Sequence, residues 1–518
     1  MGKQIKTTIN RFDGGRATDK RVSSTNKYSI TKHFDTFSNS EKLIPIRGMA
    51  SDSTGQTKIG NLLVGTDGIF YGLGTDVNNP TQGDIYKKAT YAGVWAELAN
   101  SKSGGVVSYA TFLEFQSYFY YWSAVSGGSL AKMKTDGSSQ NGTFQSSIGF
   151  STIKAQAVVH PKDGVAYFPY DNKIASLQPN GTTWSATALT IPDTRFIITS
   201  LCPFGNYLAI AIMPVNGESG GGSSQVLLWD RDSSVTTLSE SIDWGSGNLK
   251  VLNNLNGVLI GVSDLTGTIS AGATNRDNDP ILIKASTGGA PILLETLNTE
   301  KQTTTNPDSL INSIVNFIYN DKMYFSVNLV GGSTSPAHYG LWAVGRDSSG
   351  GYRVSLENLA TNGATDTGVL ACAIFGDYIS MVHTAVGTLS FSYTTALVSA
   401  LSEAYTATSI YESLVFNQGD TSTHKKWLNA FVTHRPLRSG ESVVLKYRKN
   451  QDIDNESAGW TTVFTSDTDN ASYKEAINIS GVNLPQFYEI QFRIESTGGA
   501  EITGFGFTSE IVNDGFLN

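Results

Sequence analysis

The segment Leu228–Ser234, which reads Leu-Trp-Asp-Arg-Asp-Ser-Ser, recurs as Leu341–Ser349, Leu-Trp-Ala-Val-Gly-Arg-Asp-Ser-Ser. A weaker copy is Met133–Ser139. Each copy begins with an apolar stretch and ends in a polar turn, which is typical of a short strand that leaves a buried sheet. We therefore expect Trp229 and Trp342 to pack in a core between sheets rather than to stack on a ligand.

Similar short apolar stretches lie on both sides of these copies, from about residue 55 to residue 395. They recur at spacings of roughly 40 to 65 residues, and pairs such as Asp163-Gly164 and Asn256-Gly257 supply the positive φ that tight hairpin turns need. The stretches are Asn61–Gly65, Ser117–Trp122, Gly164–Pro169, Asn206–Ile212, Gly257–Val262, Lys322–Val327 and Tyr378–Val382. Units of this length with about four short strands each predict a β-propeller of about seven blades, and six or eight blades also fit the uneven spacing.

The pattern changes after residue 400. Tyr488–Glu495 alternates strictly, so that Tyr488, Ile490, Phe492 and Ile494 share one face of a strand. Four further strands are expected at Trp427–Val432, Ser442–Arg448, Trp460–Phe464 and Ile502–Phe507. These strands predict a small β-sandwich. The whole chain is thus expected to be all-β, with an extended N-terminal arm over residues 1–50, a propeller over 51–400, and a linker and C-terminal β-sandwich over 401–518.

The first 50 residues differ from the rest in charge. They carry ten lysines and arginines against four acidic residues, although the chain as a whole has a net charge of -8. Their apolar residues are separated by glycines and serines, which prevents them from closing a core alone. We therefore expect this arm to become ordered on a partner, with Phe12, Phe34 and Phe37 as apolar anchors and Arg16 among its cations.

The composition argues against several classes of function. A net charge of -8 disfavours binding to nucleic acid in general, because that binding depends on cations that neutralise phosphates. The six histidines are scattered singly, so no metal site is expected, and neither a nucleophile elbow nor a phosphate-binding glycine loop is present. We accordingly expect no catalytic residue, no cofactor and no enzymatic activity.

Two alternatives stay open at this point. Glycoside hydrolysis needs only two carboxylates at a suitable distance, which a sequence cannot exclude. Asp452–Glu456 and Asn275–Asp279 place oxygen ligands at alternate positions, as calcium loops do, although a solvated turn explains both better. No stretch is long and apolar enough to span a membrane, and no signal peptide is recognisable at the first residues.

The N-terminal residues carry a resemblance to a known family. Ile9–Arg16, with Phe12-Asp13-Gly14-Gly15 inside it, followed by Lys32–Phe37 and Leu43–Pro45, resembles the start of tailed-phage virion proteins in which a Phe-x-Gly-Gly arm precedes a propeller. The resemblance covers about 50 residues, and the architecture is similar to that of tail-hub or nozzle proteins. It implies a non-enzymatic structural protein of the tail or neck that is made in the host cytoplasm and located in the virion.

The partners implied by this resemblance are other virion proteins and further copies of the same chain in a symmetric ring, through which DNA passes without sequence-specific binding. The alternative hypothesis is a receptor-binding or glycan-binding adhesin or baseplate protein, in which Tyr118, Tyr120, Tyr121 and Trp122 include faces that stack on sugars. A propeller glycosidase is the third reading.

Overall fold

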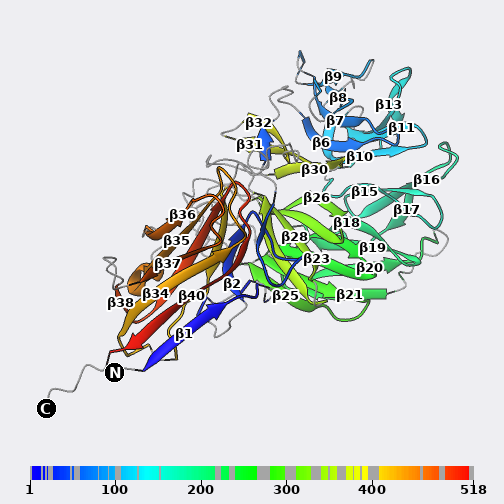
Figure 1. The fold of residues 1–518 in the computed structure, drawn as a ribbon. Helices are drawn as coiled ribbons and strands as arrows, with labels where there is room; N and C mark the ends of the chain where they lie inside the picture. The colour runs from blue at the N-terminus through cyan, green and yellow to red at the C-terminus, as the bar shows by residue number, and fades with distance from the viewer. Residues whose placement is uncertain are drawn as a thin grey trace, which may run out of the picture. The chain divides into compact units, whose positions relative to one another are not determined.

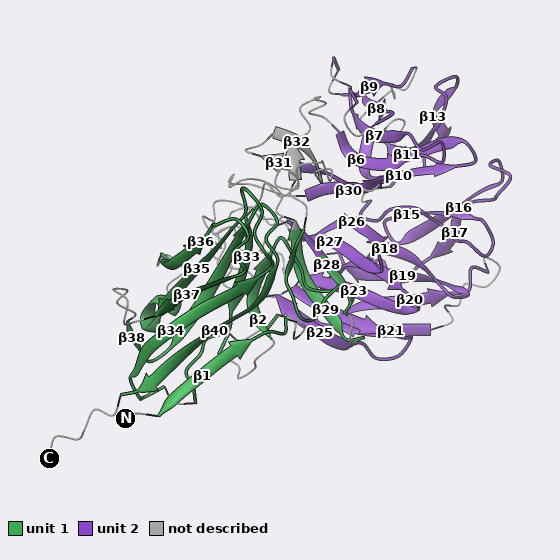
Figure 2. Cartoon of the chain, in the orientation of Figure 1, with its two compact units in different colours: residues 1–49, 343–359, 395–518 green, residues 50–342, 360–394 purple. Residues whose placement is uncertain are grey.

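A computed structural model shows an all-β chain with no α-helix among its described residues (Figure 1). It describes residues 3–12, 14, 16–17, 20–21, 27–46, 49–51, 59–76, 78–79, 81–90, 93–99, 105, 107–124, 128–150, 153–215, 223–232, 238, 240–264, 281–297, 311–327, 340–347, 350–358, 369–376, 378–385, 388–394, 408–419, 421–454, 459–477 and 485–512. Unit 1 comprises residues 1–49, 343–359 and 395–518, and unit 2 comprises residues 50–342 and 360–394 (Figure 2). This division differs from the predicted boundaries, because residues 1–49 belong to the same unit as the C-terminal residues.

Unit 2 contains six four-stranded sheets among the described residues. Five are antiparallel meanders of consecutive strands: β6 (Ile59–Val64) to β9 (Ala96–Glu97), β10 (Val107–Phe115) to β13 (Gln140–Gln145), β14 (Val158–Val159) to β17 (Trp184–Thr190), β18 (Phe196–Phe204) to β21 (Glu240–Gly245), and β22 (Asn248–Leu255) to β25 (Ile292–Leu297). The middle strands of these sheets are β7 (Phe70–Thr75), β8 (Gly83–Lys88), β11 (Tyr118–Ser123), β12 (Ser129–Lys134), β15 (Ala166–Tyr170), β16 (Lys173–Leu177), β19 (Tyr207–Pro214), β20 (Ser224–Trp229), β23 (Val258–Asp264) and β24 (Ile281–Ser286).

The sixth sheet of unit 2 combines strands from the start and the end of the unit. It has the order β30 (Val369–Phe375), β31 (Tyr378–Ala385), β32 (Thr388–Thr394) and β5 (Met49–Ser51), so a strand from the start of the unit completes a sheet from its end. Unit 2 also holds the hairpin of β26 (Ile311–Tyr319) and β27 (Lys322–Val327), and β28 (Gly340–Arg346) spans the boundary between the units in sequence.

The first strands of neighbouring sheets contact one another in one run. β6 contacts β10, β14 contacts β18, β22 contacts both β18 and β26, and β30 contacts both β26 and β6. Polar side chains bond from one first strand to the next: Asn61 Nδ2 donates to Tyr109 O at 2.6 Å, and Asn312 Nδ2 donates to Leu370 O at 2.9 Å. Each sheet therefore meets its neighbours along its first strand, which is a β-propeller-like arrangement.

Tight turns join the first and second strands. Leu255 pairs with Val258, and Asn256 and Gly257 between them have φ values of 53° and 84°. The equivalent turn between β26 and β27, at residues 320–321, also has two residues with positive φ. These are the conformations that two-residue hairpins need, and they explain why the pairs chosen from the sequence mark turns.

Successive sheets share apolar cores, as strand β11 illustrates. Phe119 and Tyr121 pack toward the sheet of β7, whereas Tyr120 and Trp122 pack toward the sheet of β15, where Trp122 lies 5.7 Å from the ring of Tyr170. Because both faces of the strand are covered, its aromatic residues are consecutive instead of alternating.

Unit 1 consists of two sheets around one core. The first has the order β1 (Gln4–Ile9), β40 (Ile502–Ile511), β34 (Lys425–His434) and β37 (Tyr473–Ile477), and β38 (Gln486–Phe487) also pairs with β34. In the second, β29 (Tyr352–Asn358), β2 (Tyr28–Lys32), β33 (Ser409–Ser413), β39 (Ile490–Thr497), β35 (Ser442–Lys449) and β36 (Thr461–Ser466) are neighbours in this order. Core side chains come from both sheets: Trp427 and Phe507 lie in the first, and Tyr411 and Phe492 lie in the second.

The predicted strands beyond residue 400 are confirmed as β34, β35, β36, β39 and β40, and the alternation in β39 is confirmed for Ile490, Phe492 and Ile494, each at most 1% exposed. Tyr488 differs, since it precedes the strand and is 38% exposed. Trp229 and Trp342 are buried, as predicted for core residues. No helix in the described part of the chain is long and apolar enough to cross a membrane.

Candidate functional site

The three phenylalanines predicted as assembly contacts lie in unit 1 and are buried there. Phe12 and Phe34 are fully covered and belong to the core, and Phe37 is 4% exposed. The ring of Phe12 meets that of Tyr411 edge-on at 5.4 Å, and its backbone N–H donates to Ser40 O. The sequence interpretation assigned these rings to a neighbouring molecule, whereas the structure places Phe12 and Phe34 in a core shared with the C-terminal strands of their own chain.

Arg16, the fourth predicted contact, lies beside β2. It forms an isolated parallel bridge with Tyr28, and its Nε donates to Ser29 O at 3.1 Å. The side chain thus helps to fix the path of the N-terminal residues within unit 1.

Several cations of the first 50 residues also find acidic partners in the same unit. Arg21 bonds to Asp454 and to Glu489, and the hydrogen bond from Arg21 lowers the pKa of the Asp454 carboxyl to about 2. Lys20 Nζ lies 3.0 Å from Asp454 Oδ1, and Lys42 Nζ lies 2.7 Å from Glu501 Oε2. The cations of this segment were expected to contact a partner. In the structure these three cations form ion pairs within their own chain.

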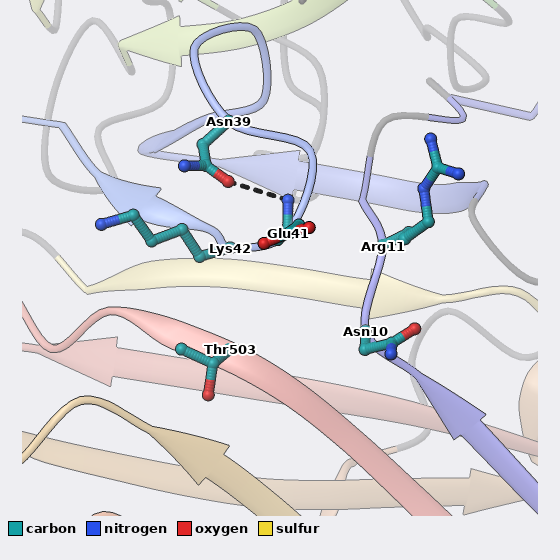
Figure 3. A pocket seen from close by; sticks show the side chains of 6 residues that line it. All are labelled: Asn10, Arg11, Asn39, Glu41, Lys42 and Thr503. Atoms are coloured by element: carbon teal, nitrogen blue, oxygen red, sulfur yellow. Dashed lines mark hydrogen bonds between the residues drawn. The ribbon is translucent and has the colours of Figure 1, made fainter.

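A polar pocket lies where the N-terminal residues meet β40 (Figure 3). Its volume is about 540 Å³, and its lining residues come from three separate parts of the chain: Asn10, Arg11, Asn39, Glu41, Lys42 and Thr503. Asn39 Oδ1 accepts a hydrogen bond from the backbone N–H of Glu41 at 2.8 Å, which fixes the loop before β4 (Ile44–Pro45). Thr503 enters the pocket because β40 bulges there against β34.

The chemistry of this pocket suits binding. Two cations, a carboxylate, two amides and a hydroxyl present donors and acceptors to a polar ligand. The lining contains neither a histidine nor a cysteine, and its carboxylate has no second carboxylate beside it among the lining residues. Sequence reasoning singled out none of these six positions for a site, because only the pairing of β1 with β40 brings residues 10–11 next to residue 503.

The aromatic residues considered for sugar stacking are in the wrong place for that role. Tyr120, Tyr121 and Trp122 are at most 1% exposed and lie between sheets of unit 2. Only Tyr118 of this group is half-buried, and Lys132 Nζ lies 4.8 Å from the centre of its ring. A sugar therefore has no open aromatic face on this part of β11.

The two acidic segments considered for calcium give no support to a metal site. Asp454 is paired with Lys20 and Arg21, while residues 455–456 and 275–279 lie outside the described residues. Within the described ranges, no group of three or more potential ligands is placed to hold a metal ion.

A polar cluster around Arg231 links two sheets of unit 2. Arg231 bonds to Asp163, its Nη2 donates to Asn206 O at 2.9 Å, and its Nη1 lies 3.1 Å from His160 Nδ1. Burial and the neighbouring guanidinium lower the pKa of His160, although its contact with Tyr207 O opposes the shift. We interpret this cluster as a structural connection between sheets.

Comparisons with known proteins found distant structural similarity and no sequence match. No family model and no curated protein matches the sequence. Among solved structures, the chain is similar to an exo-β-1,3-galactanase from Phanerochaete chrysosporium, at 12% identity over 89% of this chain and 99% of that one, with a TM-score of 0.32. It is also similar to the WD40 repeats of RRP9, at 9% identity over 67% of this chain and 99% of that one, with a TM-score of 0.41. At these TM-scores the similarity supports no conclusion about activity, and the propeller-like description rests on the strand pairing and contacts given above.

Proposed function

We propose that this protein is a non-enzymatic structural component of a tailed-phage virion, a tail-hub, nozzle or other ring subunit that acts in particle assembly. In this proposal unit 2 is a propeller of seven blades, formed by the six four-stranded sheets and a seventh blade that begins with β26 and β27. Unit 1 is a β-sandwich that includes the N-terminal residues. The partners are other virion proteins and copies of the same chain.

The observation that carries the proposal is the way the N-terminal segment is fastened. β1 pairs with β40 over six residue pairs, Leu43 exchanges two backbone hydrogen bonds with Ile502, and Phe12 lies in the core behind them. The segment that resembles the virion proteins is therefore an integral part of the core and sheets of unit 1. This arrangement supports the proposal, because a ring subunit binds its neighbours through surfaces that a folded unit holds in place.

Quantitative mass spectrometry and cryo-electron microscopy of purified phage particles test the proposal. We expect this protein at a fixed copy number that matches a ring symmetry, and the two units should fit the density of one ring. A protein that is absent from washed particles, or that turns over esters, peptides or glycosides through one essential carboxylate, contradicts the proposal.

Glycan binding is the alternative function. It is favoured by the outer surface of the sheet β1-β40-β34-β37 in unit 1, where two aromatic rings lie side by side.

A further inference from the structure

The outer face of unit 1 is the side of the sheet β1-β40-β34-β37 that points away from the core. Strand pairing fixes which side chains lie on it. Phe431 lies opposite Glu475 on β37 and opposite Gly506 on β40, and Thr433 lies opposite Tyr473. The neighbours of Phe431 along β34, Ala430 and Val432, belong to the core, so Phe431 points outward.

Two aromatic rings form the centre of this face. The ring of Phe431 occupies the space above Gly506, because a Cβ added at Gly506 would lie 2.8 Å from Phe431 Cζ. The Phe431 and Tyr473 rings are 5.9 Å apart between centroids and inclined by 31°, and Tyr473 is 49% exposed. The absence of a side chain at Gly506 thus lets one ring lie low beside another, and the two form an open aromatic platform.

Hydrogen-bonding groups are held beside the rings. Glu475 Oε1 accepts from Asn429 Nδ2 at 2.7 Å, and Glu475 Oε2 accepts from the Tyr473 hydroxyl at 2.8 Å. Lys6 Nζ lies 5.9 Å from the centre of the Phe431 ring, on the other side of the platform. Each carboxylate oxygen has a second lone pair, so Glu475 can accept further donors from a ligand without moving.

The pocket described above lies next to this face. A Cβ added at Gly504, on β40, would lie 3.0 Å from Thr433 Oγ1 on the platform side and 3.7 Å from Asn10 Cβ on the pocket side. Gly504 therefore lies between the strand neighbour of Tyr473 and a residue that lines the pocket, so a chain-like ligand that extends from the platform across β40 would reach the pocket.

We propose that the outer face of unit 1 binds a carbohydrate chain, with one sugar ring on Phe431 and Tyr473, its hydroxyls donating to Glu475, and a further unit of the chain reaching the pocket of Arg11 and Lys42. The apolar C–H face of a pyranose matches an aromatic ring, and the hydroxyls around its edge match carboxylate and amide groups, so one ligand satisfies both features. This inference deepens the glycan-binding alternative and does not depend on the proposed role in the virion.

A second copy of the chain or another protein fits this surface less well. The centre of a protein interface is usually depleted of charge and closed to water. Here a carboxylate and an ammonium group flank two rings, so closing a protein against them would desolvate both charges.

The test uses the full-length protein on an array of neutral and acidic bacterial oligosaccharides, followed by measurement of the dissociation constant for the best of them. Phe431→Ala and Tyr473→Ala should each weaken binding by about tenfold or more, equivalent to about 1.4 kcal/mol. Glu475→Gln should weaken binding less, because the amide oxygen still accepts a hydrogen bond. Tyr488→Ala is the matched control, since Tyr488 is another exposed aromatic of unit 1 and packs on His424 away from the platform.

The outcomes are separable. Circular dichroism checks that each variant is folded, and if Phe431→Ala is not, Tyr473→Ala on the edge strand decides. Failure to bind any oligosaccharide on the array, or equal binding by the native protein and the platform variants, overturns the proposal. A change in molar mass by light scattering for the platform variants, with no sugar binding by the native protein, identifies a contact between copies and also overturns it.

Discussion

Units 1 and 2 are both all-β, but they are assembled from the sequence in different ways. In unit 2 most strands pair with the next strand in the chain, as in the meander from β10 to β13. In unit 1 the central pairs join distant segments: β1 pairs with β40, and β2 pairs with β33 (Figure 2). The turn residues of a local hairpin predict that its two strands pair. No local sequence pattern predicts which distant strand another strand will pair with. The strand pairing of unit 2 is therefore easier to predict from sequence than that of unit 1.

The difference also predicts how the two units respond to damage. Each sheet of unit 2 shares its core with its immediate neighbours, so the unit depends on many similar interfaces. Unit 1 has one core to which both ends of the chain contribute. A single change in the first residues should consequently affect the whole of unit 1.

The largest expected effect comes from Phe12→Ala. Phe12 is fully buried in the core of unit 1, so we expect a loss of about 3–5 kcal/mol in the free energy of unfolding of that unit. Phe119→Ala, at a fully buried position in unit 2, should instead lower the unfolding transition of unit 2. Scanning calorimetry of both variants distinguishes the transitions. If Phe12→Ala leaves unit 1 as stable as in the native protein, the N-terminal residues are not the part of its core that we describe.

An intermediate effect is expected from acid, through His33 of unit 1. His33 is 5% exposed, and burial, with a smaller contribution from Lys32, lowers its pKa to about 4. In the unfolded chain this imidazole binds a proton below about pH 6.5, whereas in the folded chain it does so only below about pH 4. Acid therefore favours the unfolded chain, and the free energy of unfolding falls as the pH drops from 6.5 toward 4. From pH 7 to pH 5 the loss should be about 2 kcal/mol.

His33→Asn is the informative variant for this effect. The backbone of His33 has a φ of 57°, which asparagine tolerates better than most residues. Urea unfolding at pH 7 and pH 5 should show a smaller acid loss in the variant than in the native protein. Equal losses in the two proteins would mean that other groups control the acid sensitivity of unit 1.

The smallest effect concerns a turn of unit 2, where two adjacent glycines provide their own control. Gly288 has a φ of 118°, Gly289 has no positive φ, and a Cβ added to either meets nothing within 4 Å. Gly288→Ala should therefore cost about 1–2 kcal/mol through backbone strain alone, whereas Gly289→Ala should be neutral or slightly stabilising. Thermal melts of the two variants measure the difference, and equal melting temperatures would exclude strain at this turn.

The stretches predicted in unit 2 fall mostly on second strands, whereas Asn61–Gly65 falls on a first strand, β6. Gly257–Val262 and Lys322–Val327 were recognised because each follows a turn pair and is apolar, and they are β23 and β27. Their partners β22 and β26 contain Asn253 and Asn316, whose amides bond to each other at 2.9 Å where the first strands meet. Polar residues that satisfy one another in the interior look like loop residues in a sequence.

A buried polar residue was also missed in unit 1, on the other face of β39. The alternation of this strand predicts that Gln491, between Ile490 and Phe492, lies on the opposite face. The structure buries it completely, with Nε2 donating to Ser413 O at 2.8 Å and Oε1 accepting from Arg448 at 2.9 Å. The alternation of the strand predicts the direction of each side chain. The partners of Gln491 come from β33 and β35, which flank β39 in the sheet, and no local pattern predicts them.

The pairing of β1 with β40 also fixes an order of events during synthesis. β1 leaves the ribosome first, yet its partner begins at residue 502, after the whole of unit 2 has been made. At about 5–20 residues per second, a nascent β1 remains without its partner strand for roughly 25 to 100 seconds. During that time its unpaired edge and Phe12 are open to other chains on the same messenger, and a neighbour that has already finished β40 could accept them. We therefore expect the pairing of β1 with β40 to be one of the last steps in the folding of unit 1.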